Sequence, residues 1–457
     1  MIHEEVTLAE KKNRKMRPDR VKMRMQDASE RIHNFDEVAS GYTREQAIEE
    51  AMRCLYCKKV PCDEACPLHC RPAEYIALIE QGDFDKALAQ ILEYNPFPSA
   101  CGRVCVHFCE EKCTVGKKGT PLAIAWLKRA AADYGQATVS PREPTGKRVA
   151  VIGAGPAGFT VAWECAKAGH GVTIFEGLPS PGGMLWAGIP PYRLPREELN
   201  RDIQRILDLG VELRVGSPIT SEQEVLDLLE EHDAVFIGIG AHEPRWMGLE
   251  GEDLDGVIHV VDFLRDVNMG KDVKVGDKTA VIGGGSSAMD AVRTARRLGA
   301  DAFIVYRRAR EQMPADEAEI EEVEEEGIVF NFLTNPTRIL GKDGKMTGLE
   351  CLRMELGEPD ESGRRRPVPI EGSEFVIECD MMIQAISQRP DITWLEKDSK
   401  FETTRWQTFE VDPETSETSV PGIFAAGDDV SGPATIVEAI ADARKAAQGI
   451  LNHLEQT

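Results

Sequence analysis

The amino-acid sequence predicts an α/β fold that follows an all-α N-terminal domain. Two segments, 147–176 and 278–308, each show a short apolar strand, a glycine-rich turn, a helix and a second strand. The first 140 residues are rich in helix formers, with apolar residues at helical spacing. A strand, a Gly-Asp turn and a helix follow at 420–451. These observations predict two Rossmann-like nucleotide-binding domains, the second inserted in the first.

The domain limits follow from the order of these segments. The stretch VSPREPTGK (139–147) contains two prolines and predicts a linker after the helical domain. We expect a helical domain over 1–140, a discontinuous domain over 146–255 and 385–457, and an inserted domain over 256–384. The acidic run 317–327 predicts a solvated amphipathic helix without a function of its own.

Composition excludes several classes of protein. The formal net charge of −24 argues against non-specific binding to nucleic acid or anionic membranes. No window approaches the roughly 20 apolar residues of a membrane helix, and the N-terminus lacks the apolar core of a secretory signal. We therefore expect a cytoplasmic protein without a membrane span. A basic arm, Lys11 to Arg24, predicts either a solvated tail or a docking arm for an acidic partner.

The first glycine turn, VIGAGPAG, is typical of a dinucleotide site. Its glycines allow a tight strand-to-helix turn, close approach of the backbone to a pyrophosphate, and packing of helix on strand. Glu176 ends the second strand, where a carboxylate can accept hydrogen bonds from ribose hydroxyls. The residues expected to bind this cofactor are Gly153, Gly155, Pro156, Ala157, Gly158 and Glu176.

The second glycine turn favours NADPH. Its strand ends in Arg307 and Arg308 rather than in an acid, and arginines can pair with a 2′-phosphate that a carboxylate would repel. NADH stays possible, and the alternative is an arginine pair exposed on the surface. The expected binding residues are Gly283, Gly285, Ser286, Ser287, Arg307 and Arg308.

Two nucleotide sites in one chain suggest FAD in one domain and a nicotinamide nucleotide in the other. The C-terminal turn agrees, because Asp428 stands at a strand end where it could bind the ribityl or pyrophosphate part of FAD. No protein acid or base is expected to be catalytic, since the cofactors carry the chemistry.

Nine of the twelve cysteines lie between Cys54 and Cys113. Their spacing is C54-x2-C57-x4-C62-x3-C66-x3-C70, then C101-x3-C105-x3-C109-x3-C113, and such short spacings suit zinc or iron–sulfur clusters. Beside a flavin, two [4Fe–4S] clusters are favoured over structural zinc, because clusters can accept, one at a time, the two electrons that a flavin receives as hydride. The other three cysteines form no CxxC pair, which argues against a disulfide reductase. His69 and His107 lie within the cysteine-rich region and could approach a cofactor, although ordinary packing or exposure is favoured for both.

Together these motifs resemble a known family. The chain is similar to the small (beta) subunit of NADPH-dependent glutamate synthase. It also resembles the flavin-binding N-terminal half of dihydropyrimidine dehydrogenase and the large subunit of NADH-dependent ferredoxin:NADP oxidoreductase. The resemblance covers nearly the whole chain from residue 30 onward. The motifs that carry it are NPFPSACGRVC (95–105), VIGAGPAG, PGGML and GIPPYRLP (181–195), VIGGGSSAMD, VYRR and MPA (305–315), and GIFAAGDD (422–429).

The resemblance implies the cofactor-binding residues. Gly182, Gly183 and Arg193 would face FAD, and Gly427 with Asp428 would close its site. The ligands of one [4Fe–4S] cluster would be Cys54, Cys57, Cys62 and Cys113, and three ligands of the other would be Cys66, Cys105 and Cys109.

The sequence departs from the family at the fourth ligand of the second cluster. Relatives have Gln or Glu there, whereas the matching residue here is Lys128, a poor ligand while protonated. The second cluster is expected to recruit Cys70 or Cys101, and Cys70 is favoured because relatives carry Cys101 without using it. Ser286 and Ser387 also replace the usual Asn and Gly, which could alter nucleotide binding.

The resemblance further implies an electron-input subunit. NADPH would deliver a hydride to FAD, and electrons would leave singly through the clusters to a redox partner subunit in a hetero-oligomer. That partner would be the glutamate synthase large subunit. The alternative is another redox complex: a ferredoxin-linked bifurcating transhydrogenase, hydrogenase, formate dehydrogenase or sulfide reductase. A third hypothesis is a non-enzymatic scaffold.

Overall fold

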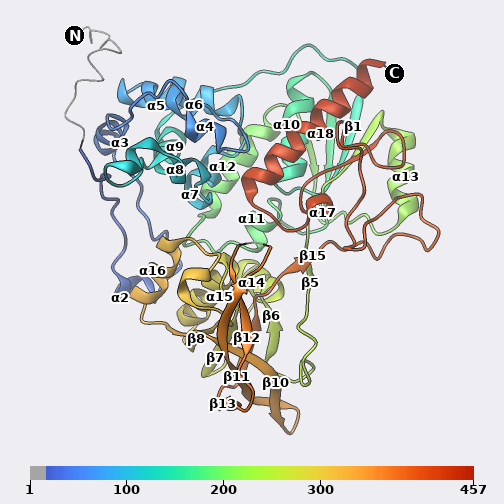
Figure 1. The fold of residues 1–457 in the computed structure, drawn as a ribbon. Helices are drawn as coiled ribbons and strands as arrows, with labels where there is room; N and C mark the ends of the chain where they lie inside the picture. The colour runs from blue at the N-terminus through green and yellow to red at the C-terminus, as the bar shows by residue number, and fades with distance from the viewer. Residues whose placement is uncertain (1–16, 362, 457) are drawn as a thin grey trace.

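A computed structural model describes residues 17–361 and 363–456 of the chain. It shows three parts: a helical domain, a first parallel sheet flanked by helices, and a second parallel sheet carrying an antiparallel extension (Figure 1). This arrangement confirms the predicted fold class. Within the described residues, no helix has the length and apolar character needed to cross a membrane.

The helical domain is built from short helices around α9. A capping box, in which Thr43 and Gln46 satisfy each other's backbone N–H groups, starts α3. Gly82, with φ of 77°, separates α5 from α6, so the segment 73–95 forms two helices. The helices of the domain are α2 (Ala28–Arg31), α3 (Arg44–Ala51), α4 (Pro61–Glu64), α5 (Pro72–Glu80), α6 (Phe84–Leu92), α7 (Pro98–Val104), α8 (Phe108–Glu111), the 3₁₀ helix η1 (Thr114–Lys117) and α9 (Ile124–Tyr134).

The first parallel sheet has the strand order β16-β4-β1-β2-β3. Alternate residues of β1 enter separate cores on its two faces, so both faces are covered. Its strands are β1 (Arg148–Ile152), β2 (Gly171–Phe175), β3 (Glu212–Arg214), β4 (Ala234–Ile237) and β16 (Ile423–Ala425). Its helices are α10 (Pro156–Lys167), α11 (Met184–Ala187), α12 (Arg196–Leu207), α13 (Glu222–Glu231), α17 (Asp428–Ser431) and α18 (Ile436–Gln456).

The second parallel sheet has the order β6-β14-β7-β8-β9, and helices and an antiparallel sheet cover its two faces. Its strands are β6 (Val257–His259), β7 (Lys278–Ile282), β8 (Asp301–Val305), β9 (Val329–Asn331) and β14 (Met381–Gln384). Its helices are α14 (Val260–Asn268), α15 (Ser286–Arg297), η2 (Arg310–Gln312) and α16 (Glu317–Glu325). The antiparallel strands are β10 (Thr334–Lys342), β11 (Lys345–Pro359), β12 (Arg365–Pro369) and β13 (Phe375–Ile377).

The second sheet is inserted in the first, because β16 returns after it to pair with β4 in parallel. A two-stranded ribbon of β5 (Glu243–Pro244) and β15 (Gln388–Arg389) joins the two units (Figure 1). The domain limits given above stay predictions.

The helical domain shares a core with the first nucleotide-binding unit. The rings of Phe97 and Phe159 lie 6.1 Å apart between α7 and α10, and Cys66, Cys70 and Cys101 belong to the same core. The cysteine-rich region is therefore packed directly against the first glycine-turn helix.

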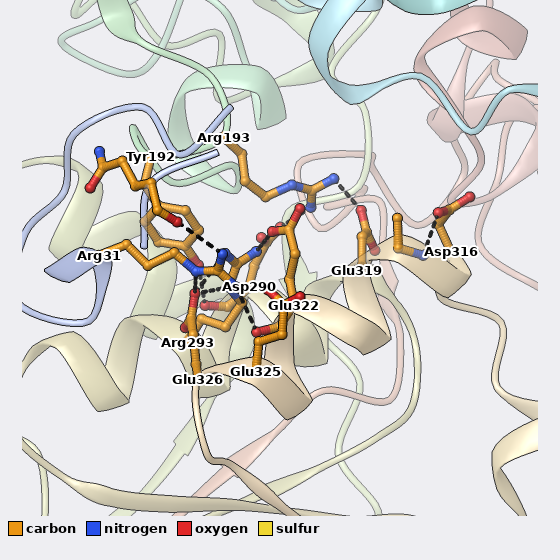
Figure 2. A network of polar contacts seen from close by, with 12 residues as sticks. Arg31, Tyr192, Arg193, Asp290, Arg293, Asp316, Glu319, Glu322, Glu325 and Glu326 are labelled. Carbon is orange, nitrogen blue, oxygen red and sulfur yellow. Dashed lines mark hydrogen bonds and ion pairs between the residues drawn. The ribbon is translucent and has the colours of Figure 1, made fainter. Parts of the chain in front are cut away.

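A buried ion network ties the N-terminal segment to the second unit (Figure 2). Arg31 donates to Glu326 at 2.9 Å, and Arg293 and Arg297 donate to the same carboxylate at 2.8 Å. Burial raises the pKa of Glu326, but the hydrogen bonds from Arg297 and the charge of Arg293 outweigh it and lower this pKa to about 2. The expectation of a solvated helix over 317–327 is thus wrong for Glu326, because three arginines from distant elements surround it.

Candidate functional site

The first glycine turn has the geometry of a phosphate-binding loop. Gly153 has φ of 99°, and a Cβ on Gly158 would lie 1.9 Å from the Gly153 carbonyl oxygen, so both positions require glycine. Glu176 accepts from the backbone N–H groups of Ala154 and Leu178, each at 2.7 Å. Burial raises its pKa, and these bonds oppose the rise. Glu176 thus fixes the turn as well as lining the cavity beside it.

The PGGML segment crosses the first turn closely. Gly183 has φ of 54°, and a Cβ there would lie 2.8 Å from the Cα of Gly155. Gly182 has φ of 118°, and its backbone N–H donates a hydrogen bond to Ala154 O at 2.8 Å. Gly155 and Gly183 therefore line the same wall of the cavity, and their backbones approach too closely for a side chain on Gly183.

Arg193 lies in the cavity wall but is paired across the units. Its Nη1 donates to Asp290 at 2.8 Å, and it also pairs with Glu319 (Figure 2). Contact of Arg193 with FAD stays a prediction; what the structure places there is an ion pair between the two units.

The second glycine turn opens α15. Gly283 has φ of 151°, and a Cβ there would lie 2.3 Å from Ala385 O. Gly285, Ser286 and Ser287 line the cavity at the N-terminus of α15, where free N–H groups favour anions.

The two arginines after β8 differ in their surroundings. Arg307 is exposed. Arg308 is buried and donates to Asp360 at 2.6 Å. Arg307 is therefore the freer cation of the two, but neither arginine lines the cavity that Gly285 and Ser286 line, so their contact with a nucleotide stays a prediction.

The C-terminal turn faces the same cavity. Gly427 has φ of 98°, and Asp428 lines the cavity after it. Burial raises the pKa of Asp428 to about 6. Asp429, which no sequence motif marks as a site residue, is fully buried and accepts a hydrogen bond from Ile239 N–H at 3.0 Å, so it holds the C-terminal turn against the end of β4.

All these turns open on one cavity of about 1320 Å³. Common cavities for single ligands measure about 300–1,000 Å³. The volume and the two phosphate-type turns fit a flavin dinucleotide and a nicotinamide dinucleotide together. The cavity is also lined by Cys105 and by His107, whose Nε2 is buried without a hydrogen-bond partner. His69, in contrast, is exposed.

The first cysteine site, Cys54, Cys57, Cys62 and Cys113, surrounds a separate cavity of about 30 Å³ with apolar walls. Burial raises the pKa of the Cys54 thiol to about 12, and the nearby Cys62 and Cys113 sulfurs add to the rise. Among residues 17–361 and 363–456, no three His, Cys, Asp or Glu side chains converge closely enough to hold a single metal ion. The four sulfurs therefore share one small apolar cavity, and thiolates in such a setting can hold an iron–sulfur cluster or zinc.

The second cysteine site gathers around Lys128. Its members are Cys66, Cys70, Cys101, Cys105 and Cys109. Lys128 is only 5% exposed, and no carboxylate in the described part of the chain pairs with it. Burial disfavours its ammonium, but the charges of Cys70, Tyr75 and Cys101 outweigh burial and raise the pKa of Lys128.

Two buried polar groups of the second site lack ordinary partners. They are the Lys128 ammonium and the Tyr75 hydroxyl, which has no hydrogen bond and lies within electrostatic range of Lys128. Buried polar groups are normally satisfied, so both point to an anionic group bound among the thiolates. A thiolate-ligated iron–sulfur cluster fits this requirement. Tyr75 was missed because an aromatic residue in an apolar helix face looks like simple core.

Two protein-family models match the chain. Residues 147–443 match pyridine nucleotide-disulphide oxidoreductase. Residues 31–139 match dihydropyrimidine dehydrogenase domain II, 4Fe-4S cluster. The matches place an FAD-binding pyridine-nucleotide unit after a 4Fe-4S domain.

Curated relatives include subunits of several complexes. The chain is 44% identical to the NADP(+)-dependent formate dehydrogenase subunit beta of Moorella thermoacetica, over 87% of this chain and 60% of that one. It is 41% identical to the NADPH-Fe(3+) oxidoreductase subunit beta of Geobacter sulfurreducens, over 87% and 64%. It is 36% identical to the glutamate synthase [NADPH] small chain of Escherichia coli, over 92% and 94%. The chain thus spans less than two thirds of the length of the first two relatives.

Among solved structures, the fold is similar to Mycobacterium tuberculosis FprA in complex with NADPH. The TM-score is 0.58 at 20% identity, over 68% of this chain and 85% of that one. This likeness concerns the fold of the two nucleotide-binding units.

Proposed function

The chain belongs to the pyridine nucleotide-disulphide oxidoreductase family, in the glutamate synthase small chain-like group with an N-terminal 4Fe-4S domain, and from this membership we propose that it is the NADPH-reactive subunit of a redox complex. Its cofactors would be one FAD and two [4Fe–4S] clusters. It would deliver electrons one at a time to a partner subunit.

One observation carries the proposal. A single cavity is lined by Gly155 of the first turn, Gly285 of the second turn and Cys105 of the second cysteine site. A nicotinamide, a flavin and a one-electron centre would therefore be close to one another without any domain movement. When bound, FAD accepts a hydride from NADPH and returns electrons singly, and iron–sulfur clusters carry single electrons.

The protein's part in this chemistry is positioning. The N-termini of α10 and α15 would each hold a pyrophosphate, and Glu176 and Asp428 would bind the sugar part of the flavin nucleotide. Arg193, held by Asp290 and Glu319, keeps the two units in register across the cavity. No acid or base in the cavity is assigned a catalytic role.

Among the described residues, Cys105 is the one cysteine that lines the large cavity, and a cavity without a thiol pair supports electron transfer over disulfide reduction. Cys165, Cys351 and Cys379 are buried, and none of them lines either cavity. The family description therefore describes the fold of this chain rather than a disulfide substrate.

The surroundings of the arginines support a preference for NADPH. Arg307 is exposed and forms no ion pair within residues 17–361 and 363–456, so it could approach a 2′-phosphate, whereas Arg308 would have to share its guanidinium with Asp360. We expect Arg307→Ala to weaken NADPH binding tenfold or more and NADH binding little. Equal losses for the two nucleotides would contradict this assignment.

The partner has two candidates. Higher identity to the formate dehydrogenase and NADPH-Fe(3+) oxidoreductase beta subunits favours a complex of that general kind. The glutamate synthase small chain is less similar but is matched over 94% of its length, so a glutamate synthase complex is the second candidate. Purification of the native complex, with identification of the chains that accompany this one, separates the two.

An anaerobic titration tests the function itself. The purified chain should hold about one FAD and about eight iron atoms, and NADPH should bleach flavin and cluster absorbance at lower concentration than NADH. Zinc in place of iron, or no bleaching by either nucleotide, would contradict the proposal.

A further inference from the structure

We propose that the surface around the first cysteine site is a docking surface for a carboxylate-rich face of a protein redox partner. The inference rests on the proposed function, because it identifies where that function delivers its electrons. It also specifies the chemistry of the partner, which the proposed function leaves open.

The first cysteine site is the outer one. Cys54, Cys57, Cys62 and Cys113 are each partly exposed, whereas the second site is largely buried and contributes Cys105 to the nucleotide cavity. A partner that must come close to an electron carrier therefore has access to the first site rather than to the second.

The segments that line this site are basic. Residues 52–62 and 112–118 contain no Asp or Glu, although the whole chain has 78 acidic and only 54 basic residues. Five exposed lysines lie on them: Lys58, Lys59, Lys112, Lys117 and Lys118. Within residues 17–361 and 363–456 none of the five forms an ion pair, so their charges are available to a partner.

Exposed apolar side chains accompany the lysines. Met52 and Leu55, on either side of Arg53 and Cys54, are 45% and 37% exposed. Apolar groups at the centre with charged groups at the rim are typical of protein interfaces.

The basic arm joins the same surface. Arg53 donates to Pro18 O at 2.7 Å, and Thr120 N–H donates to Pro18 O at 3.1 Å, so the arm passes beside both lysine-bearing segments. Arg17, exposed in this arm, pairs with Glu49. Residues Lys11, Lys12, Arg14 and Lys15 of the arm lie outside the described residues.

The charge distribution of the chain indicates which class of partner can bind the docking surface. A nucleic acid or an anionic membrane presents negative charge over a wide area and would be repelled by a chain of net charge −24. A protein with one acidic face meets only the local positive surface and is oriented by the repulsion elsewhere. A carboxylate-rich electron-transfer protein is therefore the partner that this surface fits.

The test uses the loaded full-length protein and a small acidic [2Fe–2S] ferredoxin as probe. Lys58→Glu/Lys59→Glu/Lys117→Glu should lower kcat/KM for NADPH-driven ferredoxin reduction about tenfold or more at low ionic strength. The difference should shrink below about twofold near 0.5 M salt, where the Debye length is roughly 4 Å. Carbodiimide cross-linking should join ferredoxin carboxylates to Lys58, Lys59, Lys117 or Lys118.

A matched control is Lys342→Glu/Lys345→Glu. These two exposed lysines lie on the hairpin of β10 and β11, far from the helical domain (Figure 1), and their reversal should leave ferredoxin reduction within about twofold of wild type. Equal losses in both variants, a loss that salt does not relieve, or cross-links confined to other lysines would overturn the inference.

Flavin bleaching separates this inference from the function. If NADPH bleaches the flavin in wild type and variant alike while ferredoxin reduction is unchanged by the reversal, the docking surface is wrong and the function stands. If NADPH fails to bleach the flavin of the wild-type protein, the function fails and the docking surface falls with it.

Discussion

The two cysteine sites use the same kind of side chain in opposite surroundings. The first site lies near the surface around an apolar cavity, beside five exposed lysines. The second is buried between the helical domain and α10, around Lys128 and Tyr75. The first site is therefore surrounded by positive charge at the protein surface, whereas the second site encloses the buried cation Lys128.

The difference shows that ligand spacing alone does not assign a role to a cysteine site. Both sites come from cysteines separated by two to four residues in the sequence, as Cys54-x2-Cys57 and Cys105-x3-Cys109 show. What distinguishes them is the dielectric environment and the position of the nearest cation, which set reduction potentials and partner access. We therefore expect the inner site to relay electrons from the cavity and the outer site to deliver them.

The largest expected effect is the separate loss of each site. Cys62→Ala should remove about half of the iron and leave the signals of the second site, and Cys105→Ala should do the reverse, because the ligand sets do not overlap. Iron analysis and low-temperature EPR measure this. Cys165→Ala, a buried cysteine outside both sites, serves as the control and should keep all the iron. Loss of all iron from either variant would show that the two sites do not bind iron independently, which would contradict the comparison.

The fourth ligand of the inner site gives the next test. Cys70 is 1% exposed and shares a hydrogen bond with Cys66, whereas Cys101 lies nearer the Asn95 side chain, at 3.9 Å from its amide oxygen. We expect Cys70→Ala to lower iron by up to half and Cys101→Ala to change it little. The opposite result would assign the ligand to Cys101. If both variants kept as much iron as the wild type, neither cysteine would be a ligand.

Lys128 should affect only the inner site. A unit charge about 8 Å from the transferred electron contributes about 2 kcal/mol at an effective dielectric constant near 20, or about 90 mV for a one-electron couple. Lys128→Met should lower the potential of the inner site by roughly this amount, as measured by EPR-monitored redox titration. Lys128→Arg retains the charge and should restore most of it. A shift of both sites together would mean that the charge does not distinguish them.

Removal of the metal should reduce the effect of Lys128 on stability. In the loaded protein, Lys128→Met should destabilise by about 3–5 kcal/mol, since the bound anionic group loses its counter-charge. In the metal-free protein the loss should be smaller, because the ammonium then faces chiefly the Cys66 thiolate, whose pKa is lowered to about 5 by the hydrogen bond from Cys70 and by the charge of Lys128. Urea unfolding of the wild type and the variant in both states measures this. An equal or larger loss in the metal-free protein would contradict the account of Lys128 as a counter-charge to the bound group.

Much of the fold could be predicted because its signals are local. The glycines of the two turns are required by backbone geometry within a few residues, as the close approach of Gly158 to Gly153 shows. The strand–turn–helix order around them follows from short apolar runs, and the return of the C-terminal strand follows from the same pattern. The cysteine spacing likewise indicated metal chemistry without any knowledge of the third dimension.

The surroundings of the site residues could not be predicted, because they depend on contacts between distant segments. Arg308 donates to Asp360, which lies 52 residues away in the sequence, and Arg193 donates to Asp290, 97 residues away. In the sequence both arginines looked equally free to bind a cofactor. Long-range ion pairs of this kind leave no periodicity or motif.

The sequence by itself determined the kind of chemistry, since glycine turns and clustered thiols are set by residue type and short spacing. The tertiary structure decided where that chemistry is exposed and where it is buried. It placed Lys128 within the second cysteine site and five exposed lysines around the first. Burial and electrostatic environment arise from the packing of segments that lie far apart in the sequence.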